Sequence, residues 1–433
     1  MADNAEADPL VEYSIKDLFG DRDLSFILDE SEPTVLTGAN GSGKSTVLRT
    51  IDAFSAGQWE LLDKIPFSEL RLHFKSGKSV RLKRDSKGLT FSASGHKSWT
   101  WPGPRVQRGQ LRQGERAYMA ARRHRLLDER YRGVLSATAV AELEYEYAML
   151  THQEQAVLWK DIPDWISGFQ SRLPVLYVTD QRLVLEPLSD QRRPTRQAEV
   201  STWQAVDQAV EQVQALMSAA LSDYAAESQR LDRDFPQRVV AAMSEGVKIT
   251  DSALQDQLAE NDFEAKLLQR VGLLPEDVAP QTFTDFQGDA VKPVITTFAE
   301  NTARKLAVLS PLRERLSLFV DFLSQHYRPK RIFLDPKFGI RIRVGDELIS
   351  PSQLSSGEKQ ILVLAHQILF RAEPGTLILI DEPELSLHVL WQDTFIDDIS
   401  RMGAVRNLRF LLATHSPTLI GGRDDLRRSL DIG

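Results

Sequence analysis

Short runs of alternating apolar and polar residues recur through the first hundred positions. Alternation with a period of two is typical of strands that bury one face. Turn residues separate five such runs, so the pattern predicts short strands joined by turns; the runs are YSIKDLF, SFIL, LRLHFKSG, SVRLKRD and LTFSASG, between Tyr13 and Gly95. Similar runs predict three more short strands, KRIFLD, GIRIRV and DELIS, between Lys330 and Ser350.

Four other apolar runs show no alternation. A strand that is buried on both faces, as in the middle of a parallel sheet, has this unbroken character. TLILI (Thr376–Ile380) is therefore predicted to be a central parallel strand. PTVLT (Pro33–Thr37) is predicted to be a short buried strand, and PVLYV (Pro174–Val178) and RFLLA (Arg409–Ala413) are predicted to be apolar strands.

The middle of the chain has the periodicity of helices. Apolar residues recur with alternate spacings of three and four, which is a heptad seam: Trp203, Val206, Val210, Val213, Met217, Ala220 and Tyr224. A second helical run extends from Val294 to His326 and is expected to break near Pro311. These helices form either an antiparallel arm or dimerisation unit, or an amphipathic layer packed on the rest of the chain.

The sequence GANGSGKS, from Gly38 to Ser45, fits the phosphate-binding P-loop pattern. It lies between a predicted strand and a predicted helix, where backbone N–H groups and the positive helix end can cradle phosphate oxygens. A glycine-rich turn without a ligand is the alternative. The motif predicts ATP with Mg²⁺: Lys44 contacts the phosphates and the Ser45 hydroxyl binds the metal. The candidate nucleotide-binding residues are Gly38, Asn40, Gly41, Ser42, Gly43, Lys44, Ser45 and Thr46.

Two carboxylates end the apolar run at Thr376–Ile380. Burying Asp381 and Glu382 there would be costly without a cation or partner, and a magnesium–nucleotide complex would supply one. We expect Asp381 to hold the Mg²⁺ and Glu382 to orient the attacking water. A strand that simply ends in an acidic turn is the alternative.

LSSGEKQ, from Leu354 to Gln360, resembles the signature motif of ABC-type ATPases. The resemblance implies that Ser355, Ser356 and Gly357 bind phosphate at a helix N-terminus. The alternative is a capped helix without a ligand, in which Ser355 or Ser356 is the N-cap and Glu358 lies in the first turn.

Two further residues follow from the same resemblance. His415, after the RFLLA run, matches the histidine that reaches the γ-phosphate in these ATPases, although it could be a surface residue in a turn. Gln181, after PVLYV, is the candidate for the glutamine that senses Mg²⁺ and the attacking water, although it could have a structural role.

The order of these motifs is that of an ABC-type ATPase head, similar to the SMC, RecF and OLD group. The strings LFGDRDLSFIL, YVTDQRL, SQRLDRDFPQR, DEPELSLH and ATHSP also resemble stand-alone AAA-family ATPases of prokaryotic anti-phage defence, which include the ATPase subunits of PARIS and Septu. The implied fold is an α/β head, with a mixed sheet flanked by an antiparallel β-subdomain, and an inserted helical arm. The early alternating strands would form that β-subdomain.

The resemblance also implies how such a protein works. Two heads meet head to tail, as a homodimer or within a higher homo-oligomer, and each ATP lies between one P-loop and the partner's signature. The chain would hydrolyse ATP as the sensor or scaffold of a defence system that controls a separate effector, expected to be a nuclease, in response to DNA or a phage protein. The alternative is a RecF-like or SMC-like repair ATPase that binds DNA directly.

Composition restricts the remaining possibilities. The chain of 433 residues contains no cysteine, which excludes disulfides, thiolate zinc sites and cysteine nucleophiles. No run approaches the roughly 20 apolar residues of a membrane span, so we expect a cytoplasmic protein. The net charge of −8 argues against a wholly basic nucleic-acid binder. Arginines nevertheless crowd residues 105–132, either as a contact for phosphates or acidic protein, or as a solvated helical face.

These observations predict five segments. The first three are an N-terminal half-head with the P-loop (1–108), a helical arginine-rich insertion (109–172) and a strand with the candidate glutamine loop (173–190). The fourth, residues 191–328, starts with the polar linker QRRPTRQ and continues as a helical arm. The fifth is a C-terminal half-head (329–433).

Overall fold

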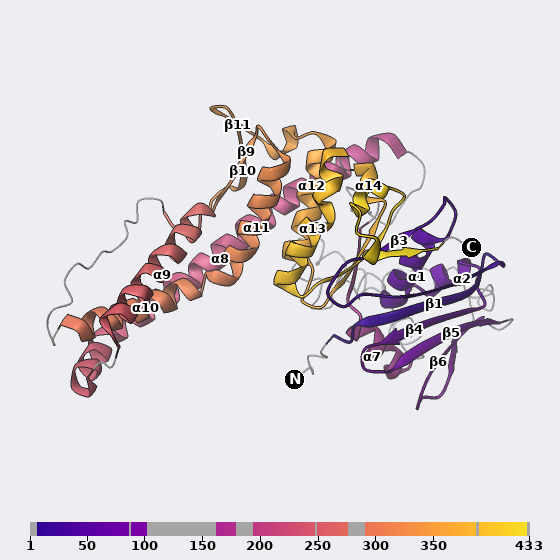
Figure 1. The fold of residues 1–433 in the computed structure, drawn as a ribbon, viewed down its shortest axis with the longest axis horizontal. Coiled ribbons are helices and arrows are strands. Elements are labelled where there is room, and N and C mark those ends of the chain that lie inside the picture. Colours follow the sequence, from indigo (N-terminus) through magenta and orange to yellow (C-terminus); the bar gives the residue numbers. More distant parts are fainter. Residues whose placement is uncertain are drawn as a thin grey trace, which may run out of the picture.

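The structure is a computed structural model. It describes residues 7–85, 88–101, 162–178, 194–246, 249–275, 291–386 and 389–430. Gln181 and the arginine-rich stretch 105–132 lie outside these residues. Figure 1 shows a head built around β-sheets, from which an arm of long helices extends to the left.

A parallel sheet of five strands forms the centre of the head. Every neighbouring pair in it is parallel, so the carboxyl ends of the strands meet at one edge. All residues of three strands, β3, β12 and β13, are buried, as their unbroken apolar sequences predicted. The strand order is β14 (Arg427–Ser429), β3 (Thr34–Thr37), β13 (Arg409–Ala413), β12 (Leu377–Asp381) and β8 (Val175–Val178).

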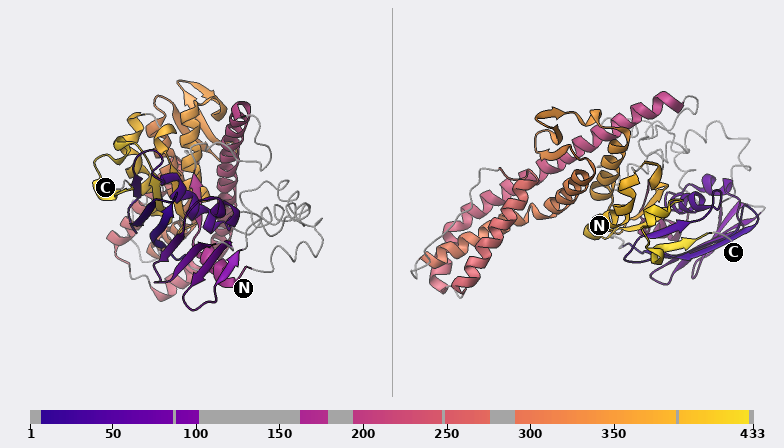
Figure 2. Two further views of the ribbon diagram at one scale, coloured as in Figure 1. Left: turned by 90° about the vertical axis from the view of Figure 1, so that its right-hand side faces the viewer. Right: turned by 45° about the horizontal axis from the view of Figure 1, so that its top comes forward.

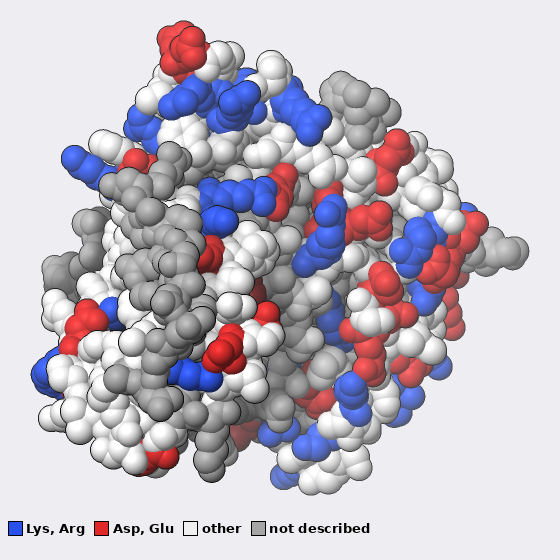
Figure 3. Space-filling view, turned by 60° about the vertical axis from the view of Figure 1, so that its left-hand side comes forward, with Lys and Arg blue, Asp and Glu red and all other residues white. Residues whose placement is uncertain are grey.

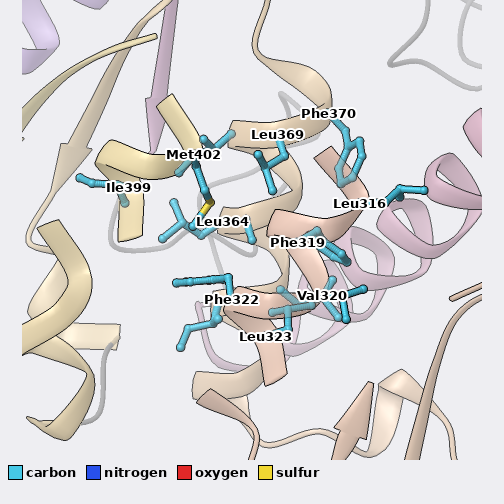
Figure 4. Close-up of a cluster of buried hydrophobic side chains, with 14 of the residues drawn as sticks. Leu316, Phe319, Val320, Phe322, Leu323, Leu364, Leu369, Phe370, Ile399 and Met402 are labelled. Carbon is cyan, nitrogen blue, oxygen red and sulfur yellow. The ribbon is translucent and has the colours of Figure 1, made fainter. Parts of the chain in front are cut away.

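Alternate residues of β12 enter two different hydrophobic cores. Leu377 and Leu379 pack in the core of the antiparallel sheet and the first helix, whereas Ile378 and Ile380 face the helical side of the head. The unbroken apolar run is thus a period-two pattern in which both faces are buried. Figure 4 shows the helical core, with side chains such as Leu316, Leu364 and Met402 meeting from three different helices.

The alternating strands near the N-terminus form an antiparallel sheet that covers the other side. Strand β4 shows the alternation plainly, because Leu70, Leu72 and Phe74 are buried and the residues between them are not. The order, with one strand (β7) that the pattern did not predict, is β2 (Arg22–Ile27), β1 (Leu10–Leu18), β4 (Glu69–Phe74), β5 (Ser79–Asp85), β6 (Gly88–Ala93) and β7 (Trp99–Trp101).

Helices complete the head. The short ones near the N-terminal half are α1 (Lys44–Ser55), α2 (Trp59–Lys64) and α7 (Asp164–Arg172). Those of the C-terminal half are η2 (Pro351–Gln353), α12 (Ser356–His366) with its π-helical continuation η3 (Gln367–Arg371), η4 (Pro383–Ser386), α13 (Val389–Arg406), α14 (Pro417–Ile420) and η5 (Asp424–Leu426).

The arm consists of α8 (Pro194–Glu245), α9 (Asp251–Arg270) and α10 (Val291–Ala307), and it returns to the head through α11 (Ser310–His326). The views in Figure 2 show α8 running from the head to the far end of the arm. The predicted second helical run is indeed interrupted, just before Pro311. The predicted polar linker is wrong in part: residues 194–197 already belong to α8, which starts at Pro194 because proline is well tolerated in a first helical turn.

The heptad seam from Val206 onward packs within its own chain, whereas the side chain of Trp203 lies outside the described residues. Val213 and Met217 are buried in the same core as the small sheet and α11. Farther along, α8 leaves the head and is held to α10 by charged contacts: Arg238 Nη2 donates to Glu300 Oε2 and Lys305 Nζ to Asp232 Oδ1, both at 2.7 Å. Apolar burial therefore fixes the base of the arm, and ion pairs add to the packing farther out.

A small antiparallel sheet lies beside α8 and leads into the signature segment. It consists of β9 (Arg331–Asp335), β10 (Gly339–Val344) and β11 (Glu347–Ile349), as the alternation predicted. A Cβ on Gly339 would lie 2.6 Å from the carbonyl oxygen of Val210 in α8, so glycine permits this close approach. Among the described residues, no helix is both long enough and apolar enough to cross a bilayer.

Two glycines that follow helices offer a matched test of how tightly the arm base is packed. Gly246 after α8 and Gly272 after α9 have φ of 74° and 73°, but only at Gly272 would a Cβ meet backbone, the oxygen of Leu334 at 2.4 Å. Gly246→Ala should cost roughly 1 kcal/mol of stability from the left-handed backbone. Gly272→Ala should cost roughly 2–4 kcal/mol because the clash is added. Thermal unfolding of both variants measures the difference, and equal midpoints would contradict the close packing.

Candidate nucleotide-binding site

The P-loop connects β3 to α1 at the carboxyl edge of the parallel sheet. Gly41 and Gly43 have φ of 77° and 104°, in the region where a side chain is strained. At Gly43 a Cβ would also lie 2.9 Å from Leu18 Cδ2. Helix α1 begins at Lys44, so its positive end and free N–H groups face the loop.

Lys44 is almost fully buried, with an exposed fraction of 4%. Its ammonium donates to the carbonyl oxygens of Gly38 at 2.8 Å and Ala39 at 3.1 Å, and lies 3.3 Å from His415 Nδ1. These contacts compensate a buried charge, and they hold the ammonium inside the loop where phosphate oxygens would be bound.

Asp381 lies at the tip of β12 with an exposed fraction of 7%. Its carboxylate accepts hydrogen bonds from Ser45 Oγ at 2.9 Å and from the Tyr177 hydroxyl at 3.1 Å. Burial, and then the nearby Asp381 carboxylate, raise the pKa of Tyr177, which therefore remains a donor at neutral pH. The hydrogen bond to Ser45 joins residues 336 positions apart in the sequence.

Glu382 and His415 face each other across the ends of β12 and β13. Glu382 has φ of 44°, which is strained for a residue with a side chain, and its N–H donates to Ala413 O at 2.8 Å. Its Oε1 lies 3.5 Å from His415 Nε2. The backbone N–H of His415 donates to Glu384 Oε1 at 2.7 Å. The loop after β12, which carries Glu382 and Glu384, therefore contacts both the side chain and the backbone of His415 in the loop after β13.

The P-loop, Glu382 and His415 line one cavity of about 390 Å³. Its lining includes Glu382, His415 and Phe19, an aromatic residue with an exposed fraction of 48%. The remaining lining residues are Asn40, Gly41, Ser42, Gly43, Lys44, Ser45 and Thr46. The Ser42 hydroxyl is buried without a hydrogen-bond partner among the described residues. A cradle of this size, with an unsatisfied hydroxyl and a buried ammonium, fits the oxygens of a polyphosphate.

The metal-ligand candidates also fit. Ser45 Oγ and an oxygen of Asp381 are 2.9 Å apart at the cavity edge. Hydroxyl and carboxylate oxygens are the donor types that Mg²⁺ prefers when it also binds substrate phosphates.

The signature segment lies elsewhere on the head surface, and its residues are not part of the cavity lining. Ser355 is the N-cap of α12 in a capping box with Glu358: its N–H donates to Glu358 Oε2 at 2.8 Å, and its Oγ accepts from Glu358 N at 3.4 Å. Lys330 Nζ donates to both oxygens of Glu358 at 2.7 Å. This is the capped-helix geometry that the sequence left open, and Ser355 and Ser356 are exposed in it.

The structure thus brings together the P-loop, Asp381, Glu382 and His415, while Ser355, Ser356 and Gly357 stand apart. The sequence had not assigned roles to three residues at the site. Tyr177 contacts Asp381 because β8 pairs with β12, with Tyr177 opposite Leu379. Glu384 follows Glu382 after a proline, and this acidic repeat was its only signal. Phe19 follows β1, and its position beside the P-loop depends on the fold.

A five-stranded parallel sheet with a P-loop, flanked by an antiparallel sheet, defines the head of an ABC-type P-loop ATPase. The chain belongs to the family described as "AAA domain, putative AbiEii toxin, Type IV TA system", whose model matches residues 186–421. The matched part includes the signature segment, both acidic residues and His415, whereas the P-loop precedes it.

The sequence identity to an individual relative is low. The chain is 28% identical over 120 residues to the "Retron Vc95 probable ATPase" of Vibrio cholerae serotype O1 biovar El Tor. That match covers 25% of this chain and only 22% of the relative.

Among solved structures, the Smc head domain of Pyrococcus furiosus bound to the C-terminal domain of ScpA has 12% identity, a TM-score of 0.38 and coverage of 95% of this chain and 91% of that one. The SMC head domain of Thermotoga maritima has 11% identity, a TM-score of 0.35 and coverage of 95% and 90%.

The buried ammonium provides the first test of the site. Lys44→Ala removes a charge that would contact phosphate oxygens, so ATP affinity should fall at least about tenfold. Lys64→Ala, at an exposed position of α2, is the control and should bind like the wild type. Titration calorimetry with ATP measures both, and unaltered affinity in Lys44→Ala would count against this site.

Proposed function

We propose that the protein binds and hydrolyses ATP at this cavity and uses the nucleotide as a switch. One observation carries the proposal: segments from opposite ends of the chain bring Lys44, Ser45, Asp381, Glu382 and His415 to a single edge of the parallel sheet. Each of these groups can take part in the transfer of a phosphoryl group to water, and the space between them can hold the phosphates.

The roles follow from position. The loop N–H groups and Lys44 bind the phosphates, and Ser45 with Asp381 would hold Mg²⁺, which neutralises charge on the phosphate oxygens. Tyr177 orients the Asp381 carboxylate. Glu382 orients the attacking water and accepts its proton. His415 sits between Lys44 and Glu382 and contacts the terminal phosphate, while Glu384 fixes its backbone.

The contacts of His415 support a switch. Its Nδ1 lies 3.3 Å from Lys44 Nζ, and its Nε2 lies 3.5 Å from Glu382 Oε1. A bound triphosphate would also contact Lys44 and His415. Nucleotide binding would therefore change how the histidine contacts both the P-loop and the acidic loop.

The signature segment acts in a second copy of the chain. In this proposal two heads meet head to tail, and Ser355, Ser356 and Gly357 complete the site of the partner. The exposure of Ser355 and Ser356, and their position outside the cavity of their own chain, support it. ATP would then hold the dimer together, and hydrolysis would release it.

The biological role that we propose is that of a sensor or scaffold subunit in a cytoplasmic anti-phage system. It would control a separate effector, such as a nuclease, and respond to DNA or a phage protein. The family description and the similarity to a retron ATPase support this role. In such a role ATP occupancy is coupled to partner binding through one shared free energy.

Glu382→Gln tests the water-activating role. The variant keeps the shape of the site but loses a proton acceptor, so it should bind ATP normally and hydrolyse it about 100-fold more slowly or worse. It should also accumulate as the ATP-bound dimer in analytical ultracentrifugation. Glu12→Gln, on an exposed strand position, controls for the loss of one charge. Normal turnover in Glu382→Gln would exclude this residue as the base.

A mixing experiment tests the composite site. Lys44→Ala damages the P-loop, and Ser356→Arg blocks the signature surface while leaving the Ser355 capping box intact. Each variant alone should be inactive. In an equal mixture, half of the dimers combine the two chains and each keeps one intact site, so about a quarter of wild-type ATPase activity should return. A mixture that stays inactive would show that the signature does not act in trans.

A further inference from the structure

The small sheet of β9, β10 and β11 has two chemically different faces. Its inner residues, such as Ile332, Ile340 and Ile342, are buried in the main helical core. Its outer residues are cationic and aromatic, and the strand register places them side by side: Arg341 pairs with Phe333, and Arg343 pairs with Arg331. We define the basic–aromatic face as Arg331, Phe333, Lys337, Phe338, Arg341 and Arg343.

The cations of this face are not neutralised. None of Arg331, Lys337, Arg341 and Arg343 forms an ion pair with a carboxylate of the described residues. The acids of the sheet lie at or next to its turns. Asp335 accepts from the backbone N–H groups of Lys337 at 2.8 Å and Phe338 at 3.0 Å. Asp346 lies in the β10–β11 turn, and Glu347 is the first residue of β11. Figure 3 shows Lys and Arg side chains gathered at the top of the molecule, where Figure 1 places this sheet.

The aromatic rings lie among these cations. The guanidinium of Arg343 is 5.2 Å from the ring centre of Phe333, and that of Arg341 is 4.9 Å from the ring centre of Phe338. Lys337 Nζ approaches the ring of Phe338 at 5.2 Å. Phe338 has an exposed fraction of 49%, unusual for a phenylalanine in a chain with a well-formed core. The cation–π contacts hold the rings and the charges in one layer.

We propose that the basic–aromatic face binds single-stranded nucleic acid. Four cations that have no acidic partner among the described residues, on a protein of net charge −8, favour a polyanion. The exposed ring of Phe338 adds a surface on which an unpaired base can stack, which the paired bases of a duplex cannot use and which an acidic peptide does not need. Arginine beside an aromatic ring can contact phosphate with its N–H groups and a base with its plane.

The position of the face gives such binding a route to the site of the partner chain. β11 ends at Ile349, and the next residue, Ser350, caps the short helix η2, which leads to Ser355. Nucleic acid on the sheet would therefore touch the element that orients the signature segment. Binding itself does not depend on the proposed ATPase activity, because the basic–aromatic face shares no residue with the cavity lining.

The test is fluorescence anisotropy with labelled oligo(dT) of about 20 nucleotides and the same length of duplex, at stepped KCl concentrations and without ATP. With four cations engaged, the plot of log affinity against log salt should have a slope of about −2.8. Arg341→Ala with Arg343→Ala should halve that slope. Phe338→Ala should weaken binding roughly 5- to 100-fold, because one base loses its stacking partner, and should leave the salt slope unchanged.

The control is Lys78→Ala with Lys97→Ala, which removes two exposed charges from the antiparallel sheet of the head. It should bind like the wild type, and thermal unfolding should show all variants folded. The proposal is overturned if the folded wild type does not bind oligo(dT), if duplex binds more tightly, if the control loses as much as the arginine pair, or if Phe338→Ala has no effect. Competition by polyglutamate as effective as that by unlabelled oligo(dT) would instead indicate an acidic protein partner. If the ATPase tests fail while these results hold, only the nucleotide proposal is lost.

Discussion

The parallel pairing of β3, β13 and β12 is the constraint on which the site depends. Because these strands run in the same direction and in register, the P-loop, the acidic tip and the histidine loop all emerge at one edge. Alternate residues of β12 also anchor two separate cores, so a shift of one residue would exchange both sets of side chains. The hydrophobic packing of the head thereby fixes the position of every polar group at the cavity.

Local strain at the site is maintained by that framework. Glu382 has an unfavourable positive φ, a cost of order 1–2 kcal/mol. Its backbone N–H is bonded to β13, and the neighbouring Glu384 is bonded to the histidine loop. The same residues that place the carboxylate beside the cavity thus connect the ends of two strands. The histidine loop is therefore bonded directly to the acidic loop, outside the hydrogen bonds of the sheet.

The elements that could be predicted from the sequence are those that carry their own signal. The unbroken apolar strands, the alternating strands and the interruption before Pro311 each follow from local pattern, and the P-loop follows from spacing. Tyr177 and Glu384 could not be assigned because their roles arise from contacts between elements. The same limit applies to Arg341 and Phe333, which become neighbours only through strand pairing. The linker prediction failed because polar residues around Pro194 suit a helix start as well as a loop.

Helix α8 has a mechanical consequence. It is continuous over 52 residues, and its buried seam is fixed to the head up to about Met217. The remaining residues extend about 40 Å farther, at 1.5 Å for each residue. A tilt of about 5° at the base would therefore displace the far end by about 4 Å. A small rearrangement at the base of the arm would therefore produce a larger displacement at its far end, which a second protein bound there could recognise.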